Sequence, residues 1–396
     1  MHVLLATDHY PPHTNGHAVA VAWWAQALVE AGLRVTVVAA GRGPATPLLD
    51  HDSYRELWLS TRGIGREGHP LSALAARTSR LRELEGDAPD LLHLHGYGPL
   101  CALVERRFPH VTKVATIHQF PEGSGAPDWP PVRAVMRWQL RRVFSRAALA
   151  SAPSACAAAR LSELTGDRDV RVIPTGVDPV FESAGPVERT APAEATAPAE
   201  RATPAKRTGP VDRATPAEAG ARSRPLQVLY VGRRSPDKRF GTVVELARRH
   251  PEARWSALGS GRLSEAGWPE SLRVLPQAGA TGVAAAMREA DVLIAPSVNE
   301  TQGLAALEAL FVGTPVAAPR GSAQAELIQE GVNGALYRPD SLEEAWQAVQ
   351  LAAALPRTGL RESVAPWRRE ALVRRMLETY AEVGGRPTSR GPRRGP

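Results

Sequence analysis

The chain has 396 residues, 43% of them hydrophobic, and this length exceeds the usual size of one domain, so we expect two domains with separate cores. Of the formal charge of +7, the tail 385–396 supplies four and the segment 183–225 supplies two, which leaves a nearly neutral body and argues against a nucleic-acid partner. The two cysteines have no metal-ligand spacing, and no apolar run approaches the roughly 20 residues that span a bilayer, so we expect a cytoplasmic protein without structural zinc.

The first part of the chain alternates short apolar strands with helical patterns. Such alternation predicts an α/β domain built on a parallel sheet with helices on both faces. We assign this domain to residues 1–182. The expected strands lie at 3–6, 35–39, 91–94, 114–117 and 172–173, and a helical pattern covers 18–31.

Two histidines, His93 and His95, lie on and next to the expected strand 91–94. We expect them to face opposite sides of the sheet. One of them would then approach a ligand cleft, and the other would be structural.

The segment 131–147 has a helical pattern with two interpretations. It carries five arginines, no acidic residue and an apolar stripe. A basic amphipathic helix of this kind docks on anionic lipid, which would place the protein on the inner face of the membrane. The more ordinary interpretation is a helix whose apolar side packs in the core and whose arginines are solvated. The stripe consists of Val132, Val135, Met136, Leu140, Val143 and Phe144.

Asp167-Arg168-Asp169 imitates a metal-binding Asp-x-Asp motif. It directly precedes an expected strand at 170–173, however, as an ordinary turn would. We therefore expect no metal site there.

The segment 183–225 is rich in alanine, proline and threonine and has almost no large apolar residue. Such a segment cannot offset the entropy of ordering by burying apolar surface. We expect it to be a disordered insert between two domains, and we expect disorder in the basic tail 385–396 as well.

A second α/β series covers residues 226–364. Its expected strands lie at 226–231, 255–258, 274–275, 292–295 and 315–318. The chain therefore predicts two doubly wound parallel-sheet domains, one on each side of the insert.

Gly232-Arg233 and Lys238 follow the first strand of this second series. Ligands bind at the ends of parallel strands, and both cations suit a phosphate. Lys238 is one of only three lysines among 48 basic residues, so its presence runs against the composition of the chain. The alternative is a solvated turn, because the residues from 233 to 237 have turn composition.

A second motif follows the expected strand 292–295 and the bend Pro296-Ser297. It runs from Glu300 to Leu304, and a helix that begins near Gly303 contains Glu308. A helix N-terminus presents free N–H groups and a partial positive charge that suit a diphosphate. Carboxylates accept hydrogen bonds from sugar hydroxyls, although two glutamates eight residues apart are common by chance.

These patterns, in this order, resemble the large retaining glycosyltransferase family 4. That family carries a Gly-Arg…Lys phosphate clamp and a Glu-x7-Glu motif after a Pro-Ser bend, and both are present here. The resemblance covers almost the whole chain except the insert and the tail. It implies the GT-B fold, in which two Rossmann-like domains face each other across a cleft and a C-terminal helix, here 365–384, crosses back onto the first domain. Further matching segments are 10–12, 15–16, 90–96, 153–154 and 174–178.

Carried over position by position, the resemblance implies a binding site for a nucleoside diphosphate-sugar. Arg233 and Lys238 would bind the diphosphate and stabilise its charge as it leaves. Gly303 and Leu304 would add backbone amides. Gly16 would let the first loop approach the phosphates and the acceptor without a side chain in the way.

The resemblance also assigns residues to the sugar and the nucleoside. Glu300 would orient the donor sugar, with His118 as a hydrogen-bonding aid, and Glu308 would hold the ribose. Together with Arg233 and Lys238, the first two form the expected catalytic set. Two departures from the family pattern blur the identity of the donor: Gln302 stands where an aromatic residue is usual, and Asn15 replaces the first glycine of a common pair.

The implied activity is the transfer, with retention, of a hexosyl or N-acetylhexosaminyl unit from a UDP- or GDP-sugar to a hydroxyl. The nucleotide-sugar would be a co-substrate, with no metal and no other cofactor. The acceptor would be a small molecule, such as a natural product or an aminocyclitol, or a lipid. Two alternatives stay open: a nucleotide-sugar epimerase of the same fold and a non-catalytic nucleotide-sugar-binding protein. The acceptor-side candidates are Asn15, His95, Glu122 and Asp128.

Overall fold

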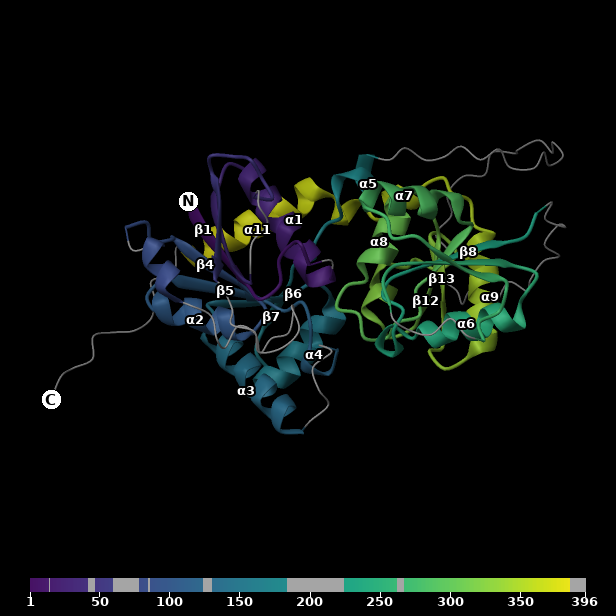
Figure 1. Cartoon of the computed structure of the whole chain (residues 1–396), viewed down its shortest axis with the longest axis horizontal. Coiled ribbons are helices and arrows are strands. Elements are labelled where there is room, and N and C mark those ends of the chain that lie inside the picture. The colour runs from purple at the N-terminus through teal and green to yellow at the C-terminus, as the bar shows by residue number, and fades with distance from the viewer. Residues whose placement is uncertain are drawn as a thin grey trace, which may run out of the picture.

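The structure is a computed structural model that describes residues 1–13, 15–41, 47–59, 78–84, 86–123, 130–183, 224–261 and 267–384. The expected disordered insert, except for its first residue and its last two, lies outside these residues, as do the tail and Asp128. Figure 1 shows two α/β domains side by side.

Within the described residues, seven strands form the first sheet. They are β1 (His2–Thr7), β2 (Arg34–Ala40), β3 (Tyr54–Leu59), β4 (Leu91–His95), β5 (Thr112–Thr116), β6 (Leu149–Ala152) and β7 (Val170–Val172). All pair in parallel, in the order β3-β2-β1-β4-β5-β6-β7. The direction of winding therefore reverses between β1 and β4, and a reversal of this kind leaves a crevice at the carboxyl ends of the strands.

Two helices of the first domain begin where the sequence supplies a capping side chain. The Asn15 side chain accepts the backbone N–H of Ala18 at 2.9 Å, and Ser154 does the same for Ala157 at 3.0 Å. Capping of this kind satisfies an N–H group that has no partner inside the helix. The elements are α1 (Gly16–Glu30), η2 (Thr78–Leu84), α2 (Pro99–Arg107), η3 (Pro121–Gly123), α3 (Pro130–Arg146) and α4 (Ala155–Thr165).

A second parallel sheet contains six strands among the described residues. They are β8 (Gln227–Val231), β9 (Arg254–Leu258), β10 (Leu272–Leu275), β11 (Val292–Ile294), β12 (Val316–Pro319) and β13 (Gly334–Tyr337), in the order β10-β9-β8-β11-β12-β13. The winding reverses between β8 and β11. Both domains are therefore doubly wound, and the predicted GT-B architecture is confirmed.

The remaining elements accompany this sheet or lead back from it. They are α5 (Pro179–Ser183), η4 (Pro236–Lys238), α6 (Phe240–Arg249), α7 (Ala280–Glu289), α8 (Leu304–Phe311), η5 (Ala323–Leu327), α9 (Leu342–Ala353), α10 (Leu360–Ser363), η6 (Ala365–Trp367) and α11 (Arg369–Gly384).

Each sheet has a hydrophobic core on both faces. Along β1, Val3 and Leu5 belong to one cluster of buried side chains, and Leu4 and Ala6 belong to another. Successive side chains of a strand point to opposite faces, so an unbroken apolar run marks a strand that is covered on both sides.

The chain crosses between the domains twice. After β7 it crosses to the second domain before α5, because Val177 and Phe181 pack in the core of that domain and α5 contacts α7 and α8. The packing therefore places the boundary between the two domains before Val177, earlier in the chain than the expected boundary after residue 182. Helix α11 crosses back, since its buried residues join the cluster of Val3 and Leu5, and Figure 1 shows it among the elements of the first domain. These buried residues include Leu372, Met376, Tyr380 and Val383.

Helix α3 packs its apolar side on the first sheet through Met136, Leu140, Val143 and Phe144. The expected stripe was wrong at Val135, whose side chain is 59% exposed, and its neighbour Trp138 is 61% exposed. Within the described part of the chain, no helix combines the length and the apolar composition needed to cross a membrane.

The packing of α11 gives a prediction. Met376→Ala leaves a cavity under the first sheet and should lower the free energy of unfolding by about 2–5 kcal/mol. Urea unfolding followed by circular dichroism measures this loss. The control is Glu378→Ala, two positions away on the exposed side of the same helix, which should change stability by less than about 0.5 kcal/mol. Equal effects of the two substitutions would contradict the docking of α11.

Candidate functional site

A cavity of about 810 Å³ lies between the two domains. Its walls are loops that follow the carboxyl ends of strands. His9, His118 and Thr175 come from the first domain, after β1, β5 and β7, and Gly232 and Ala295 follow β8 and β11 in the second. Because all strands of a parallel sheet end at the same edge, loops that are distant in sequence meet here.

The loop after β8 is held by close backbone contacts. A Cβ atom on Gly259 would lie 2.3 Å from the carbonyl oxygen of Gly232, so the two loops can pass only without a side chain at that point. The buried guanidinium of Arg234 donates to the carbonyls of Gly259 and Gly261, and Tyr230 Oη donates to Arg233 O at 2.6 Å. Arg234 and Tyr230 therefore fix the backbone that presents Arg233.

Every charged side chain that lines the cavity, all within the described residues, makes an ion pair. Arg233 pairs with Asp237 at 2.8 Å, and Lys238 Nζ lies 2.7 Å from Glu300 Oε1. The third cation, Arg160, pairs at 2.9 Å with Glu122, which does not line the cavity. The Arg233–Asp237 pair is about half exposed and contributes at most about 1 kcal/mol, so a phosphate group can replace the aspartate at little cost.

Helix α8 begins at the cavity. Gly303 precedes it in a left-handed conformation, with φ of +88°, and a Cβ atom there would lie 2.5 Å from the Cβ of Gln324. No side chain caps this helix, so its first N–H groups have no side-chain partner, and Gly303, Leu304 and Ala305 line the cavity. The Gln324 amide donates to the carbonyls of Ala295 and Ser297 and thereby fixes the bend that leads to the helix.

Gln302, the departure from the family pattern, has a structural role. Its amide group is buried and bridges both backbone groups of Thr175: Oε1 accepts from the Thr175 N–H at 2.9 Å, and Nε2 donates to the Thr175 carbonyl at 2.5 Å. Thr301 Oγ1 donates to the His118 carbonyl at 3.0 Å. An aromatic residue at position 302 could not make the two bonds to Thr175, so the glutamine ties the site motif to the linker between the domains.

Glu308 is not among the residues that line this cavity. It is half-buried on α8, where burial and the charge of Asp178 raise its pKa to about 8. The structure therefore brings Arg233, Lys238, Glu300, Gly303 and Leu304 together in the wall of the cavity, and Glu308 is not part of that wall.

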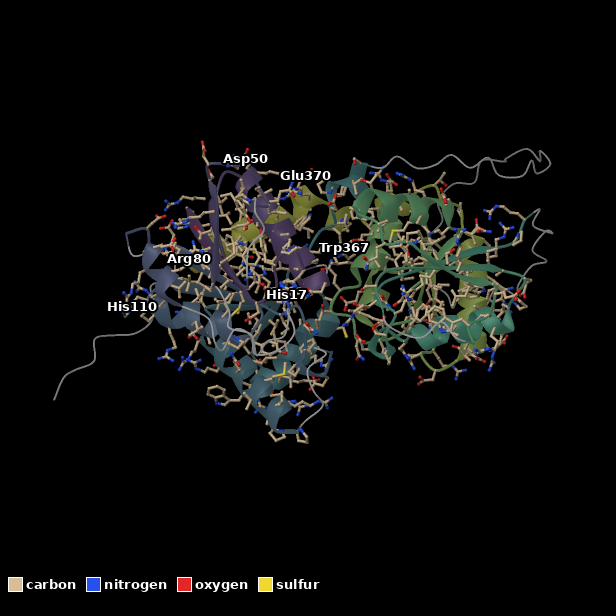
Figure 2. All side chains as sticks on the ribbon, viewed as in Figure 1. His17, Asp50, Arg80, His110, Trp367 and Glu370 are labelled. Atoms are coloured by element: carbon tan, nitrogen blue, oxygen red, sulfur yellow. The ribbon has the colours of Figure 1, made fainter. Side chains whose placement is uncertain are left out.

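The opposite wall is built from a row of histidines. Its central ring, His118, stacks on His17 with centroids 4.7 Å apart and lies beside the His95 ring, nearly parallel to it, with centroids 5.1 Å apart. The row continues from His17 to His9 at 5.1 Å and from His95 to His93 at 4.0 Å. Figure 2 labels His17 at the side of the first domain that faces the second. His17 was not predicted from the sequence, although its position directly after Gly16 was a usable signal.

The expectation that His93 and His95 face opposite sides was wrong. Side chains alternate along a strand, so residues two apart share a face, and the two rings lie next to each other. Both side chains are fully buried. Neither residue lines the cavity. The His95 ring contacts His118, which does line it, and the His93 ring contacts His95.

Burial keeps four rings of this row, those of His17, His93, His95 and His118, uncharged. It lowers the pKa of His93 and of His118 to about 3, and it lowers the pKa of His17 and of His95 well below the usual value. Repulsion between neighbouring rings adds to the effect at His17, His93 and His95. These four rings are therefore neutral at pH 7 and offer hydrogen bonds rather than charge.

The other acceptor-side candidates differ in whether they line the cavity. Asn15 lines the cavity and caps α1. Glu122 does not line it, and its carboxylate is engaged by Arg137 at 2.7 Å and by Arg160 at 2.9 Å. Asp128 lies outside the described residues.

The neutral state of the buried histidines predicts how the free energy of unfolding changes at low pH. A histidine whose pKa is lower in the folded state stabilises the fold fully above about pH 6.5, and this contribution is lost as the pH falls toward about 3. His93→Asn should therefore flatten the fall of the unfolding free energy below pH 6.5 by up to about 1.4 kcal/mol per pH unit. Urea unfolding at several pH values measures the slope. His110→Asn, at an exposed position, should keep the wild-type slope, and equal slopes for both variants would contradict the burial argument.

Comparisons with known proteins agree with this geometry. The family model described as Glycosyltransferase Family 4 matches residues 14–181, and the model described as Glycosyl transferases group 1 matches residues 212–365. A 2-deoxystreptamine glucosyltransferase from Streptomyces kanamyceticus is 28% identical over 74% of this chain and 78% of its own length. A D-inositol 3-phosphate glycosyltransferase from Salinispora arenicola is 35% identical, but the match covers 30% of this chain and only 28% of that relative.

A solved structure shares the fold. HepE from Anabaena, in complex with UDP and glucose, superposes with a TM-score of 0.67 at 16% identity, covering 96% of this chain and 100% of that one. The two family models match in the order of the two domains and together cover most of both. The chain therefore belongs to the family 4-like glycosyltransferases of the GT-B fold.

Proposed function

We propose that this protein transfers a hexosyl or N-acetylhexosaminyl unit, with retention of configuration, from a UDP-sugar to a hydroxyl group of a cyclitol. One observation carries the proposal: Arg233, Lys238 and the uncapped start of α8 gather in one cavity with His118 and Gly16 of the first domain. That arrangement fits a diphosphate at one end and a sugar between the two walls.

The chemistry follows from where charge develops. As the anomeric C–O bond breaks, negative charge grows on the diphosphate, and fixed cations and amides at the start of α8 stabilise it. In front-face substitution, a leaving phosphate oxygen takes the proton of the acceptor hydroxyl, so no carboxylate nucleophile is needed. Glu300 accepts hydrogen bonds from the sugar hydroxyls, and Lys238, 2.7 Å away, holds it in place.

The proposal of UDP as the nucleotide and of a cyclitol as the acceptor draws on the relatives. HepE is described with UDP and with glucose, and the two relatives are named for inositol phosphate and 2-deoxystreptamine, which are both cyclitols. The cavity supports a neutral or anionic cyclitol better than a cationic one. Its two acidic residues are paired with Arg233 and Lys238, and Glu122 is paired behind the wall.

A lipid acceptor is the second candidate, and the outer face of α3 supports it. Val135 and Trp138 are exposed there, and Arg142 lies over the Trp138 ring. An aromatic side chain flanked by arginines suits an interface with anionic lipid. This face would then hold the protein at the inner surface of the membrane.

Turnover with a panel of acceptors tests the proposal. We expect UDP release that depends on a cyclitol, with inositol, inositol 3-phosphate and 2-deoxystreptamine as probes. Transfer only to a lipid, together with sedimentation on anionic vesicles that Trp138→Ser abolishes, would favour the second candidate. A changed sugar without any acceptor would indicate an epimerase, and binding without turnover would indicate a sensor.

The Lys238–Glu300 pair gives a prediction that separates binding from transfer. Lys238→Ala should weaken UDP binding at least about tenfold, because a charge-assisted bond to phosphate is lost. Glu300→Gln should leave UDP binding equal or tighter, because Lys238 is released, while transfer falls about 10²-fold or more. Calorimetry with UDP and turnover with UDP-sugar measure the two effects.

The matched control is Arg248→Ala on the exposed surface of α6, which should change neither quantity. If Lys238→Ala and Glu300→Gln reduced binding and transfer to the same extent, the assignment of separate phosphate and sugar roles would be wrong.

A further inference from the structure

The row of histidines contains enough fixed hydrogen bonds to assign its protons. His17 Nε2 lies 3.0 Å from the carbonyl oxygen of His95 and 3.2 Å from Thr7 Oγ1. A carbonyl only accepts, and the Thr7 hydroxyl already donates to the His9 carbonyl at 2.8 Å. His17 therefore carries its proton on Nε2.

His93 is fixed by a chain of hydroxyl groups. Ser151 donates to the Ala115 carbonyl at 3.4 Å, and Thr116 and Ser151 lie 2.6 Å apart. If each hydroxyl donates once, Thr116 donates to Ser151 and accepts from His93 Nε2 at 2.7 Å. His93 Nδ1 then accepts from Tyr380 Oη at 2.6 Å. His93 is thus anchored from both sides, and it supports the ring of His95 at 4.0 Å.

The ring nitrogens of His95 have a single hydrogen-bond partner among the described residues. Its Nδ1 lies 2.9 Å from His118 Nε2, whereas its own Nε2 is fully buried and has no hydrogen-bond partner. A proton on that Nε2 would be a stranded buried N–H group, which native structures avoid more strictly than an unused acceptor. The proton of His95 therefore lies on Nδ1 and is donated to His118.

The consequence reaches the cavity. His118 Nε2 accepts from His95, so the proton of the neutral His118 ring must lie on Nδ1. Among the described residues, no protein group bonds to this Nδ1, and His118 lines the cavity. We infer that His95 is a positioning residue: it fixes the tautomer of His118, so that the cavity receives an Nδ1–H donor rather than a bare nitrogen.

This assignment deepens the proposed function and rests on it for the identity of the ligand. An N–H donor at this wall suits an oxygen of the donor sugar opposite the diphosphate end. It also separates the roles of the two walls. The second domain binds charge, and the first domain supplies a directed neutral donor, so His118 takes no proton from the acceptor.

The tautomer can be measured without substrate. In the ligand-free full chain labelled with ¹⁵N, two-bond ¹H–¹⁵N correlations distinguish protonated from bare ring nitrogens, and the signals missing from His118→Gln identify His118. We expect a protonated Nδ1 and a bare Nε2. The opposite pattern would overturn the inference, whatever the protein catalyses.

A pair of nearly isosteric substitutions tests the positioning role. His95→Asn keeps an N–H donor where Nδ1 was, and His95→Leu removes it. We expect His95→Asn to retain kcat within about fivefold, and His95→Leu to lower kcat about 10- to 100-fold with little change in the KM for the UDP-sugar. Equal kcat values for the two variants would show a merely structural role. If the tautomer is as expected but no acceptor supports transfer, the proposed function fails and the proton assignment stands.

Discussion

The site depends on one constraint, which is that both sheets are parallel throughout. Parallel pairing brings every strand of a sheet to an end at the same edge, and in this protein the two edges face each other across the cavity. Loops that are separated by hundreds of residues therefore become neighbours. The reversals of winding at β1/β4 and at β8/β11 open room at the middle of each edge, where a ligand can reach both domains.

Burying polar groups costs free energy, and the two walls of the cavity limit this cost in different ways. On the second domain, cations are kept and are paired, as in Arg233–Asp237 and Lys238–Glu300. On the first domain, the polar rings are kept uncharged, because burial holds the pKa values of His93 and His118 far below neutrality. A doubly charged ligand end is therefore drawn to one wall, and the neutral sugar is left to the other.

The domains are joined through the site itself rather than beside it. Thr301 donates to the His118 carbonyl, and Gln302 bridges Thr175, so the motif that leads to α8 contacts the first domain directly. Glu326 of η5 accepts the backbone N–H groups of Ala155 and Cys156 at 2.8 and 2.6 Å, at the start of α4. Helix α11 adds a further link between the domains, because its Tyr380 forms a hydrogen bond with His93 of the first domain. Movement of one domain against the other would therefore disturb the walls of the cavity.

Local patterns in the sequence determined the two parallel sheets, the family and the neighbourhood of Arg233, because an apolar run covered on both faces, a turn and a helix start are all properties of short segments. Only the tertiary structure decided which charges meet and which rings stack. Lys238 pairs with Glu300 across a separation of 62 residues, and His17 reaches His118 from the start of α1. The row of histidines could not be predicted from spacing, since its hydrogen bonds and its neutrality come from burial between elements that are not adjacent in sequence. The placement of His93 and His95 on one face was available from strand geometry alone, but their partners were not.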